Sequence, residues 1–174
     1  MRIPLPGLNH ADPTGARRLN GHDGRPALGY AVGIDTGGVM LLYSTVGTND
    51  WDRAIRFYEA IFAVLGQPRL PDWAAGWAGW GQDYDAGFCF CLCHPFDGRP
   101  ATGGNGAMLA FCARDAAQVR AFHTAGLAAG GSDAGAPGTR PDYGPAFYVA
   151  YLRDPDGNKL AAVFHRYDPS EDAA

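Results

Sequence analysis

Charged residues are scarce in this sequence, and neither a basic cluster nor a long apolar run stands out. Asp, Glu, Lys and Arg make up 18% of the 174 residues, and the formal net charge is -4. A nucleic-acid groove needs a stripe of Lys and Arg, so this class of partner is disfavoured. No apolar stretch approaches the roughly 20 residues that cross a bilayer, and the N-terminus lacks the order of a signal peptide. We therefore expect a soluble, cytoplasmic protein with no nucleic-acid or membrane partner.

Cysteine is also sparse, and its placement argues against disulfide bonds. Three of the four cysteines, Cys89, Cys91 and Cys93, alternate along one strand-like run, and the fourth is Cys112. Alternate residues of a strand share a face but are poorly placed to bridge one another. Without a secretory context we expect free thiols that pack as small apolar groups, with Phe90 and Leu92 on the opposite face.

Several motifs of common enzyme classes are missing. The sequence contains no nucleophile elbow, no phosphate-binding glycine loop and no dinucleotide fingerprint. The glycine-rich segment 103–106 precedes a strand-like run rather than a helix, so it offers no helix N-terminus to an anion.

The first 39 residues differ from the rest of the chain. They are rich in Gly, Pro, Asp and Arg and show neither a helical nor a strand period. Such a segment buries too little apolar surface to offset the entropy of ordering it. We expect residues 1–39 to be an extended or disordered arm, with packing on the domain or on a second subunit as the alternative, and Met40 as an alternative start.

From Met40 onward the pattern becomes regular. Residues 40–46 form a short strand-like run, and Asn49 and Asp50 offer N-caps for a helix over Trp51–Leu65. Gly66 suits the left-handed position that follows a helix. The remaining predicted elements are strands at 73–81 and 87–96, a strand at 107–113, a helix over Asp115–Ala129, a Gly/Pro-rich loop at 132–145, and strands at 147–152 and 159–165.

The order of these elements repeats after roughly 65 residues, which is typical of duplicated modules rather than of a solenoid. We predict an α+β fold of two paired βαβββ modules that form a cupped mixed sheet. The domain covers residues 40–169, with modules at about 40–100 and 104–169, and 170–174 form a tail. A concave, largely apolar cup is a binding pocket by its geometry.

Three stretches resemble the vicinal oxygen chelate superfamily, which includes glyoxalases, bleomycin-resistance proteins and extradiol dioxygenases. The first is Thr48–Asp50 followed by Ala54–Tyr58, similar to the family's turn and helix. The second, Gly104–Phe111, resembles the strand that opens the second module, and the third, Asp154–Leu160, resembles its closing hairpin. The resemblance covers roughly Met40–Arg166, and its strength lies in the combination, because an Asp-Pro-Asp-Gly-Asn turn alone is common.

The resemblance also indicates what has been lost. Metal-dependent members place His or Glu side chains at four strand positions around one divalent ion. Three of these positions fall at or near Tyr43, Met108 and Ala161, and the fourth falls within Cys89–Cys93, where we assign it to Cys91. A phenol stays protonated at neutral pH, a thioether is a weak ligand, and a methyl group offers no donor. We therefore predict no metal and no other cofactor.

The function implied by these features is binding of a small, aromatic or hydrophobic molecule in the cup. The aromatic and strand residues predicted to line it are Tyr43, Trp73, Trp77, Cys91, Met108, Tyr148 and Ala161. Stacking and a few hydroxyl groups suit such a ligand.

Two alternatives belong to other classes. The first is a metal-dependent lyase or isomerase like glyoxalase I, or a dioxygenase, with its ligands replaced by Cys91, His94 or His165. The second is an interaction module that pairs with another copy, because the family often forms homodimers. Catalytic residues cannot be assigned from the sequence.

Overall fold

The computed structural model describes residues 41–71, 73–82 and 86–170. The predictions for residues 1–39 and 171–174 lie outside this part of the chain. In chain order the elements are β1 (Tyr43–Gly47), α1 (Trp51–Val64), β2 (Trp77–Gly81), β3 (Cys89–Cys93), β4 (Leu109–Cys112), α2 (Ala116–Ala128), β5 (Ser132–Thr139), the 3-10 helix η1 (Pro141–Tyr143), β6 (Tyr148–Arg153) and β7 (Lys159–Phe164). No helix among the described residues is long and apolar enough to cross a membrane.

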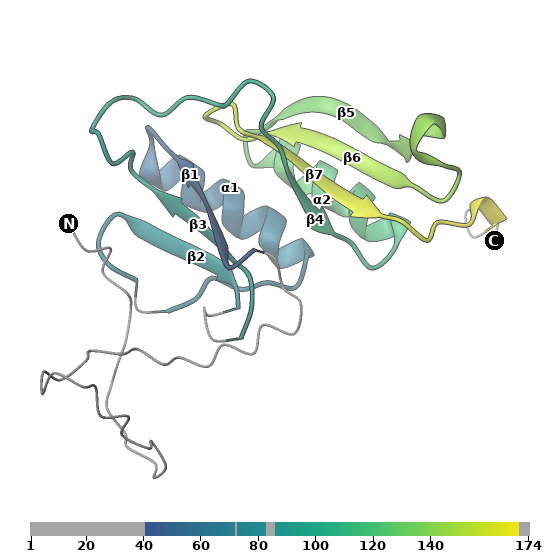
Figure 1. The fold of residues 1–174 in the computed structure, drawn as a ribbon, viewed down its shortest axis with the longest axis horizontal. Helices are drawn as coiled ribbons and strands as arrows, with labels where there is room; N and C mark the ends of the chain where they lie inside the picture. The colour runs from purple at the N-terminus through teal and green to yellow at the C-terminus, as the bar shows by residue number, and fades with distance from the viewer. Residues whose placement is uncertain (1–40, 72, 83–85, 171–174) are drawn as a thin grey trace, which may run out of the picture.

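The strands form two small sheets, one in each module (Figure 1). The first has the order β1-β3-β2, with β1 parallel to β3. The second has the order β4-β7-β6-β5, with β4 parallel to β7. The second module is thus a complete βαβββ unit, whereas in the first one strand is reduced to a single bridge between Arg69 and Trp80. The α+β fold and the duplicated modules predicted from the sequence are present.

Local sequence fixes both helices. Asp50 caps α1 by accepting a hydrogen bond from the Arg53 amide at 3.1 Å, and Asp115 caps α2 in the same way through the Gln118 amide at 2.6 Å. Gly66 follows α1 with φ +72°, a conformation that favours glycine. The predicted helix boundaries are therefore correct to within about one residue.

One element was predicted wrongly. Residues 132–145 were expected to form a loop, but Ser132–Thr139 form strand β5. This strand lies at the edge of the second sheet and pairs only with β6, with register shifts on either side of Gly135. An edge strand with bulges tolerates Gly135, Pro137 and Gly138, which would disrupt a central strand.

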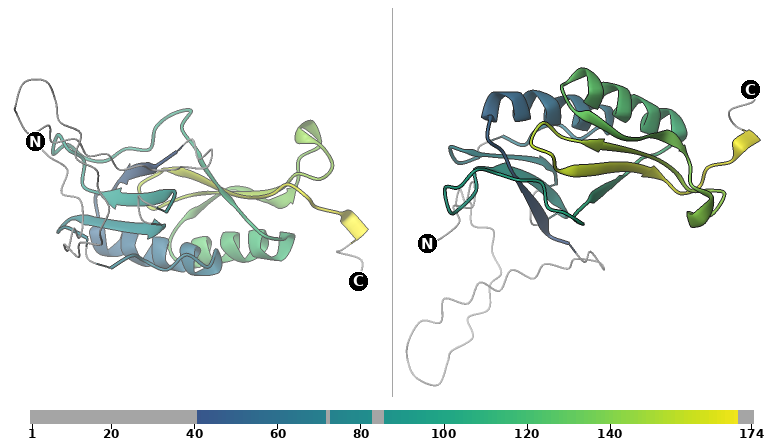
Figure 2. Two further views of the ribbon diagram at one scale, coloured as in Figure 1. Left: turned by 60° about the horizontal axis from the view of Figure 1, so that its bottom comes forward. Right: turned by 90° about the horizontal axis from the view of Figure 1, so that it is seen from above.

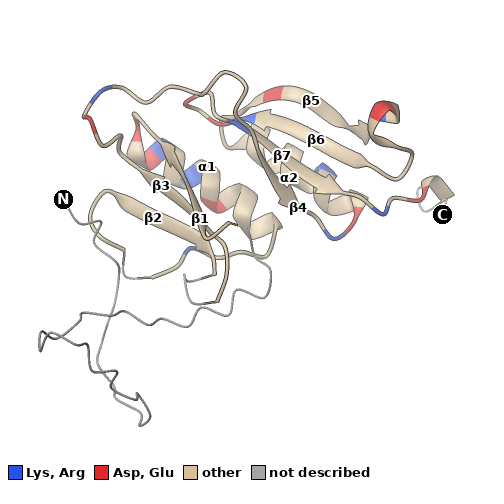
Figure 3. Cartoon of the chain, in the orientation of Figure 1, with Lys and Arg blue, Asp and Glu red and all other residues tan. Residues whose placement is uncertain are grey.

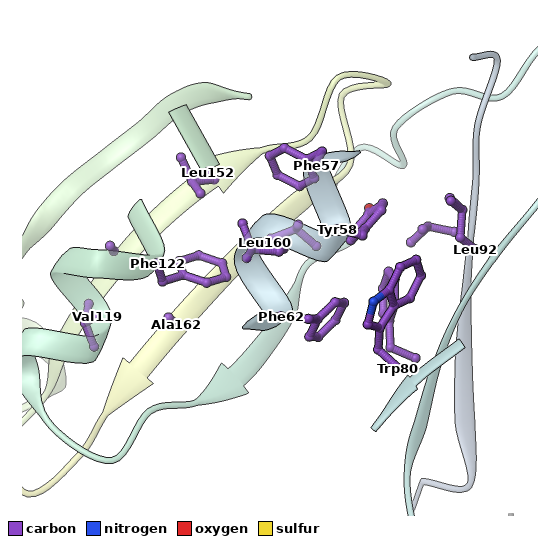
Figure 4. Close-up of a cluster of buried hydrophobic side chains, with 14 of the residues drawn as sticks. Phe57, Tyr58, Phe62, Trp80, Leu92, Val119, Phe122, Leu152, Leu160 and Ala162 are labelled. Carbon is purple, nitrogen blue, oxygen red and sulfur yellow. The ribbon is translucent and has the colours of Figure 1, made fainter. Parts of the chain in front are cut away.

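Both helices lie on the same side of the two sheets (Figure 2). Between helices and sheets lies one core to which both modules contribute (Figure 4). Its largest fully buried side chains include Phe57, Tyr58, Trp80 and Phe90 from the first module and Phe122 from the second. The modules therefore share a hydrophobic core and are not two separately packed units.

The opposite side of the sheets, turned away from the helices, is called here the helix-free face. The strand alternation assigns the residues of β3 to the two sides: Phe90 and Leu92 belong to the core, so Cys89, Cys91 and Cys93 lie on the helix-free face. All three cysteines are buried, and none of them forms a disulfide bond with another cysteine of the described residues. This confirms the prediction that the cysteines fill one face of the strand and the apolar residues fill the other.

Candidate functional site

A cleft of about 330 Å³ lies between the two sheets, where the free edge of β1 approaches the start of β4. It is called here the inter-sheet cleft. It is lined by Ser44, Thr45, Val46, Gly47, Thr102, Gly104, Ala107, Met108, Leu109, Asn158 and Lys159. Its volume falls at the small end of the range of about 300–1,000 Å³ that is usual for small-molecule sites.

Aromatic rings cover the helix-free face of the first sheet. Trp73 lies directly over Gly79, where a Cβ atom would come within 2.2 Å of its ring. The rings of Trp73 and Trp77 are stacked, with centroids 6.5 Å apart and planes at 16°. Gly79 pairs with Cys91 in the sheet, so Trp73 occupies the side-chain position next to this residue, whose exposure is 0%. The absence of a side chain at position 79 thus allows a tryptophan to lie flat on the sheet.

Two cations flank Tyr151 on the helix-free face of the second sheet. The guanidinium carbon of Arg140 lies 5.3 Å from the centroid of the Tyr151 ring, and Nζ of Lys159 lies 4.9 Å from it. These distances are typical of cation–π contacts. Ala161 pairs with Tyr151 and is fully buried beside it.

The candidate residues do not converge on one point. Met108 lines the inter-sheet cleft and is 46% exposed, and Tyr43 begins β1 beside the cleft residue Ser44. Cys91 and Ala161 are buried on the helix-free faces of two different sheets. Trp73 and Trp77 lie together on the first sheet.

Tyr148 requires a correction. It was expected to line the cup, but it belongs to the core on the helix side of β6. Its hydroxyl accepts a hydrogen bond from Arg120 of α2 at 3.3 Å, and its ring packs against Tyr167 with centroids 4.6 Å apart. Strand alternation places Tyr151, and not Tyr148, on the helix-free face.

A network of hydrogen bonds joins the turn before α1 to the turn between β6 and β7, and it borders the cleft at Asn158. Asp156 accepts hydrogen bonds from the Thr48 hydroxyl at 2.7 Å and from the backbone and side-chain amides of Asn49 at 3.0 and 2.9 Å. Asn49 in turn exchanges hydrogen bonds with the backbone of Ala101. We call these contacts, with those of Asp154 below, the turn-to-turn network.

Asp154 is the buried centre of this network, with 3% of its surface exposed. Its carboxylate accepts a hydrogen bond from the Tyr58 hydroxyl of α1 at 2.5 Å, from the backbone amides of Asp156 and Asn158, and from the Asn158 side chain. Two of the sequence stretches that carried the family resemblance are therefore in direct contact. Their shared role is to fix one module against the other.

Solved structures show the same fold. A glyoxalase/bleomycin resistance protein from Albidiferax ferrireducens T118 is 37% identical, with a TM-score of 0.61, and the match covers 70% of this chain and 94% of that one. The chain belongs to the glyoxalase/bleomycin-resistance (vicinal oxygen chelate) superfamily.

More distant structures agree on the fold alone. A glyoxalase-related enzyme from Fulvimarina pelagi is 22% identical, with a TM-score of 0.55, and the match covers 70% of this chain and 85% of that one. A family enzyme from Burkholderia phytofirmans PsJN is 20% identical, with a TM-score of 0.55, over 71% and 97% of the two chains. No protein-family model and no curated protein sequence matches the chain.

The family resemblance puts four side chains of this chain at the positions of the family's metal ligands. The positions carried over from the family hold a phenol, a thioether, a methyl group and a buried thiol. In the described ranges no three His, Cys, Asp or Glu side chains gather as a metal site. The substitutes considered from sequence are dispersed as well: His94 packs against the Trp51 ring with centroids 5.5 Å apart, and His165 is exposed beyond β7.

Tyr58 gives this superfamily member a testable dependence on alkaline pH. Burial, and then the adjacent Asp154 carboxylate, raises the pKa of Tyr58 well above its ordinary value of 10.0. A phenol with a raised pKa contributes its full stability below the unfolded value and loses it as the pH rises through the folded value. We expect Tyr58→Phe to lower the free energy of unfolding by about 1–2 kcal/mol at pH 7, because the hydrogen bond to Asp154 is lost.

Wild type and Tyr58→Phe should therefore differ in their free energy of unfolding at pH 7. Above pH 10 this difference should shrink by about 1.4 kcal/mol per pH unit, because only the unfolded wild-type chain gains a phenolate at position 58. Urea denaturation of both proteins between pH 7 and pH 11 measures it, and the other ionisable groups cancel in the comparison. Two parallel stability profiles would contradict the raised pKa.

Proposed function

We propose that this protein binds a small aromatic or hydrophobic molecule in the inter-sheet cleft and does so without a metal ion. The observation that carries the proposal is the composition of the cleft, a cavity of about 330 Å³ at the junction of the modules with apolar groups and hydroxyls on its walls. Val46, Met108 and Leu109 supply apolar contact, and Thr45 and Thr102 supply hydroxyl groups. Such a mixture suits an amphipathic ligand.

The turn-to-turn network supports this role. It fixes Asn158 and Lys159 of the second module against β1 of the first, so the walls of the cleft are held in place before a ligand arrives. Asn158 also donates a hydrogen bond to the Gly47 carbonyl at 3.4 Å, across the cleft's end. A preformed site loses less entropy on binding than one that must be ordered.

Filling the cleft should weaken binding strongly. The neutral fluorescent probe N-phenyl-1-naphthylamine is expected to bind the wild-type chain saturably, with one site per chain. Thr45→Trp places an indole in the cleft and should weaken binding of the probe roughly tenfold or more. Thr124 is an exposed threonine of α2 that is not part of the cleft lining, and Thr124→Trp serves as the matched control.

Titrations of the probe followed by fluorescence, with circular dichroism to confirm that both variants are folded, make the comparison. Equal affinities for wild type and Thr45→Trp would place the probe elsewhere and would refute the cleft as the site. Stimulation of hemithioacetal turnover by an added divalent metal would favour the enzymatic reading instead.

A further inference from the structure

Charge on the strands is confined to three residues. In the strands that the structure describes, only Asp133, Arg153 and Lys159 are charged, and the whole first sheet is uncharged (Figure 3). Of these three, only Lys159 lines the inter-sheet cleft. The cleft therefore has a single charged residue among its described lining residues, and the charge is positive.

The ammonium group of Lys159 has no carboxylate partner in the part of the chain that the structure describes. It makes neither a hydrogen bond nor an ion pair with any residue of the described ranges, and its one described interaction is with the face of the Tyr151 ring at 4.9 Å. The residue is only partly exposed to solvent. Because this cation is held by the face of a neutral ring and not by a carboxylate of the described chain, an anion placed beside it meets no competing counter-ion.

The neighbouring cations differ in this respect. Arg140 donates hydrogen bonds to the carbonyl oxygens of Thr139 and Ala136 at 3.0 and 2.9 Å, and Arg153 donates one to the Gly157 carbonyl at 2.8 Å. Their guanidinium groups are thus anchored to the backbone of their own module. Lys159 is the cation that remains available to a ligand.

Neutral donors surround the same space, and no described lining residue is acidic. Thr45 and Thr102 contribute hydroxyl groups to the lining, whereas Ser44 shares the strand parity of the core residue Val46. A carboxylate in the cleft would repel an anionic ligand, whereas hydroxyl and ammonium groups donate hydrogen bonds to it.

We propose that the ligand of the inter-sheet cleft is an aromatic or hydrophobic acid, whose anionic oxygens pair with the Lys159 ammonium. This inference rests on the proposed function and names the chemical class of its ligand. Lys159 lies two residues before Ala161 on the same face of β7, where metal-dependent relatives are expected to hold a carboxylate ligand. In this proposal the Lys159 side chain supplies the positive charge that pairs with the oxygens of the ligand.

Two probes of nearly the same shape separate this inference from the proposed function. N-Phenyl-1-naphthylamine is neutral, and 8-anilino-1-naphthalenesulfonate is the same skeleton with a sulfonate. The wild-type chain should bind the sulfonate more tightly than the neutral probe. Lys159→Met should weaken binding of the sulfonate about tenfold and change the affinity for the neutral probe less than about twofold. Lys159→Arg keeps the charge and should retain most of the preference.

Arg166 is exposed beyond β7 and is not part of the cleft, so Arg166→Met controls for a general loss of positive charge. Added salt should lower the affinity for the sulfonate and leave the affinity for the neutral probe unchanged. Saturable binding of neither probe would refute the proposed function itself. Binding of both probes with an affinity ratio unchanged by Lys159→Met would refute the role of Lys159 and leave the cleft as a neutral site.

Discussion

Asp154→Ala is expected to lower the free energy of unfolding by about 3–5 kcal/mol, the range for removing one partner from a buried charged network. The carboxylate is 3% exposed and accepts four hydrogen bonds, from the Tyr58 hydroxyl, two backbone amides and the Asn158 side chain. Alanine leaves all four donors without this acceptor, and the Tyr58 hydroxyl lies where water cannot easily replace it.

Urea denaturation followed by circular dichroism measures this loss. Asp97→Ala is the matched control, because Asp97 is exposed and bonds only within its own turn, to Arg99; its effect should stay within about 0.5 kcal/mol. Asp154→Asn keeps the shape of the side chain and one acceptor oxygen, so its loss of unfolding free energy should lie between those of Asp97→Ala and Asp154→Ala. A loss below 1 kcal/mol for Asp154→Ala would show that the network does not hold the modules together.

Phe62→Ala should be similarly costly, at about 3–5 kcal/mol, because it leaves a large cavity in a closely packed core. Phe62 is 3% exposed and stacks on Trp80 with centroids 5.4 Å apart and planes at 18°. It also meets Phe111 of β4 edge-to-face at 5.1 Å. One ring of α1 therefore packs on both modules (Figure 4).

The same denaturation experiment checks whether the modules unfold together. Phe96→Ala removes a ring that is 87% exposed and should have almost no effect. If the core is continuous, Phe62→Ala shifts a single transition to lower urea without splitting it. Two separate transitions, or a loss no larger than that of Phe96→Ala, would contradict a core shared by both modules.

Much of the fold could be predicted because its signals are local. The helices are marked by Asp50 and Asp115 at their starts and by Gly66 after α1, and each feature acts within one turn of the chain. Strand alternation likewise predicted that the cysteines of β3 lie on the face opposite to Phe90 and Leu92. Strand β5 escaped prediction since its glycines and proline are tolerated only at a sheet edge, and position within a sheet is not visible in sequence.

The turn-to-turn network shows a second limit. The sequence Asp-Pro-Asp-Gly-Asn indicated a turn, which is present, but its carboxylates also bind Thr48 and Tyr58 about a hundred residues earlier. Side-chain acceptors in a turn usually serve that turn, so local reasoning assigned them no distant partner. The combination of Thr48–Asp50 with Asp154–Asn158 in the family resemblance was the available signal.

The residues predicted to line the cup lie in several different places in the structure. The aromatic pair Trp73 and Trp77 and the cleft residue Met108 lie on or beside the predicted face, whereas Tyr148 faces the helices. Lys159 was not among the predicted residues, although it shares strand parity with Ala161. The role proposed for it rests on the absence of a carboxylate partner among the described residues, and such an absence is not visible in the sequence.

Metal content measured together with probe binding tests the central claim most directly. The purified full-length chain is incubated with Ni²⁺, Zn²⁺, Mn²⁺ or Fe²⁺, freed of excess ion by gel filtration, analysed by plasma mass spectrometry, and titrated with N-phenyl-1-naphthylamine with and without EDTA. We predict well below one equivalent of each metal and the same probe affinity in both buffers. One equivalent of metal per chain, with probe binding that disappears on chelation, would contradict a ligand site that works without a metal.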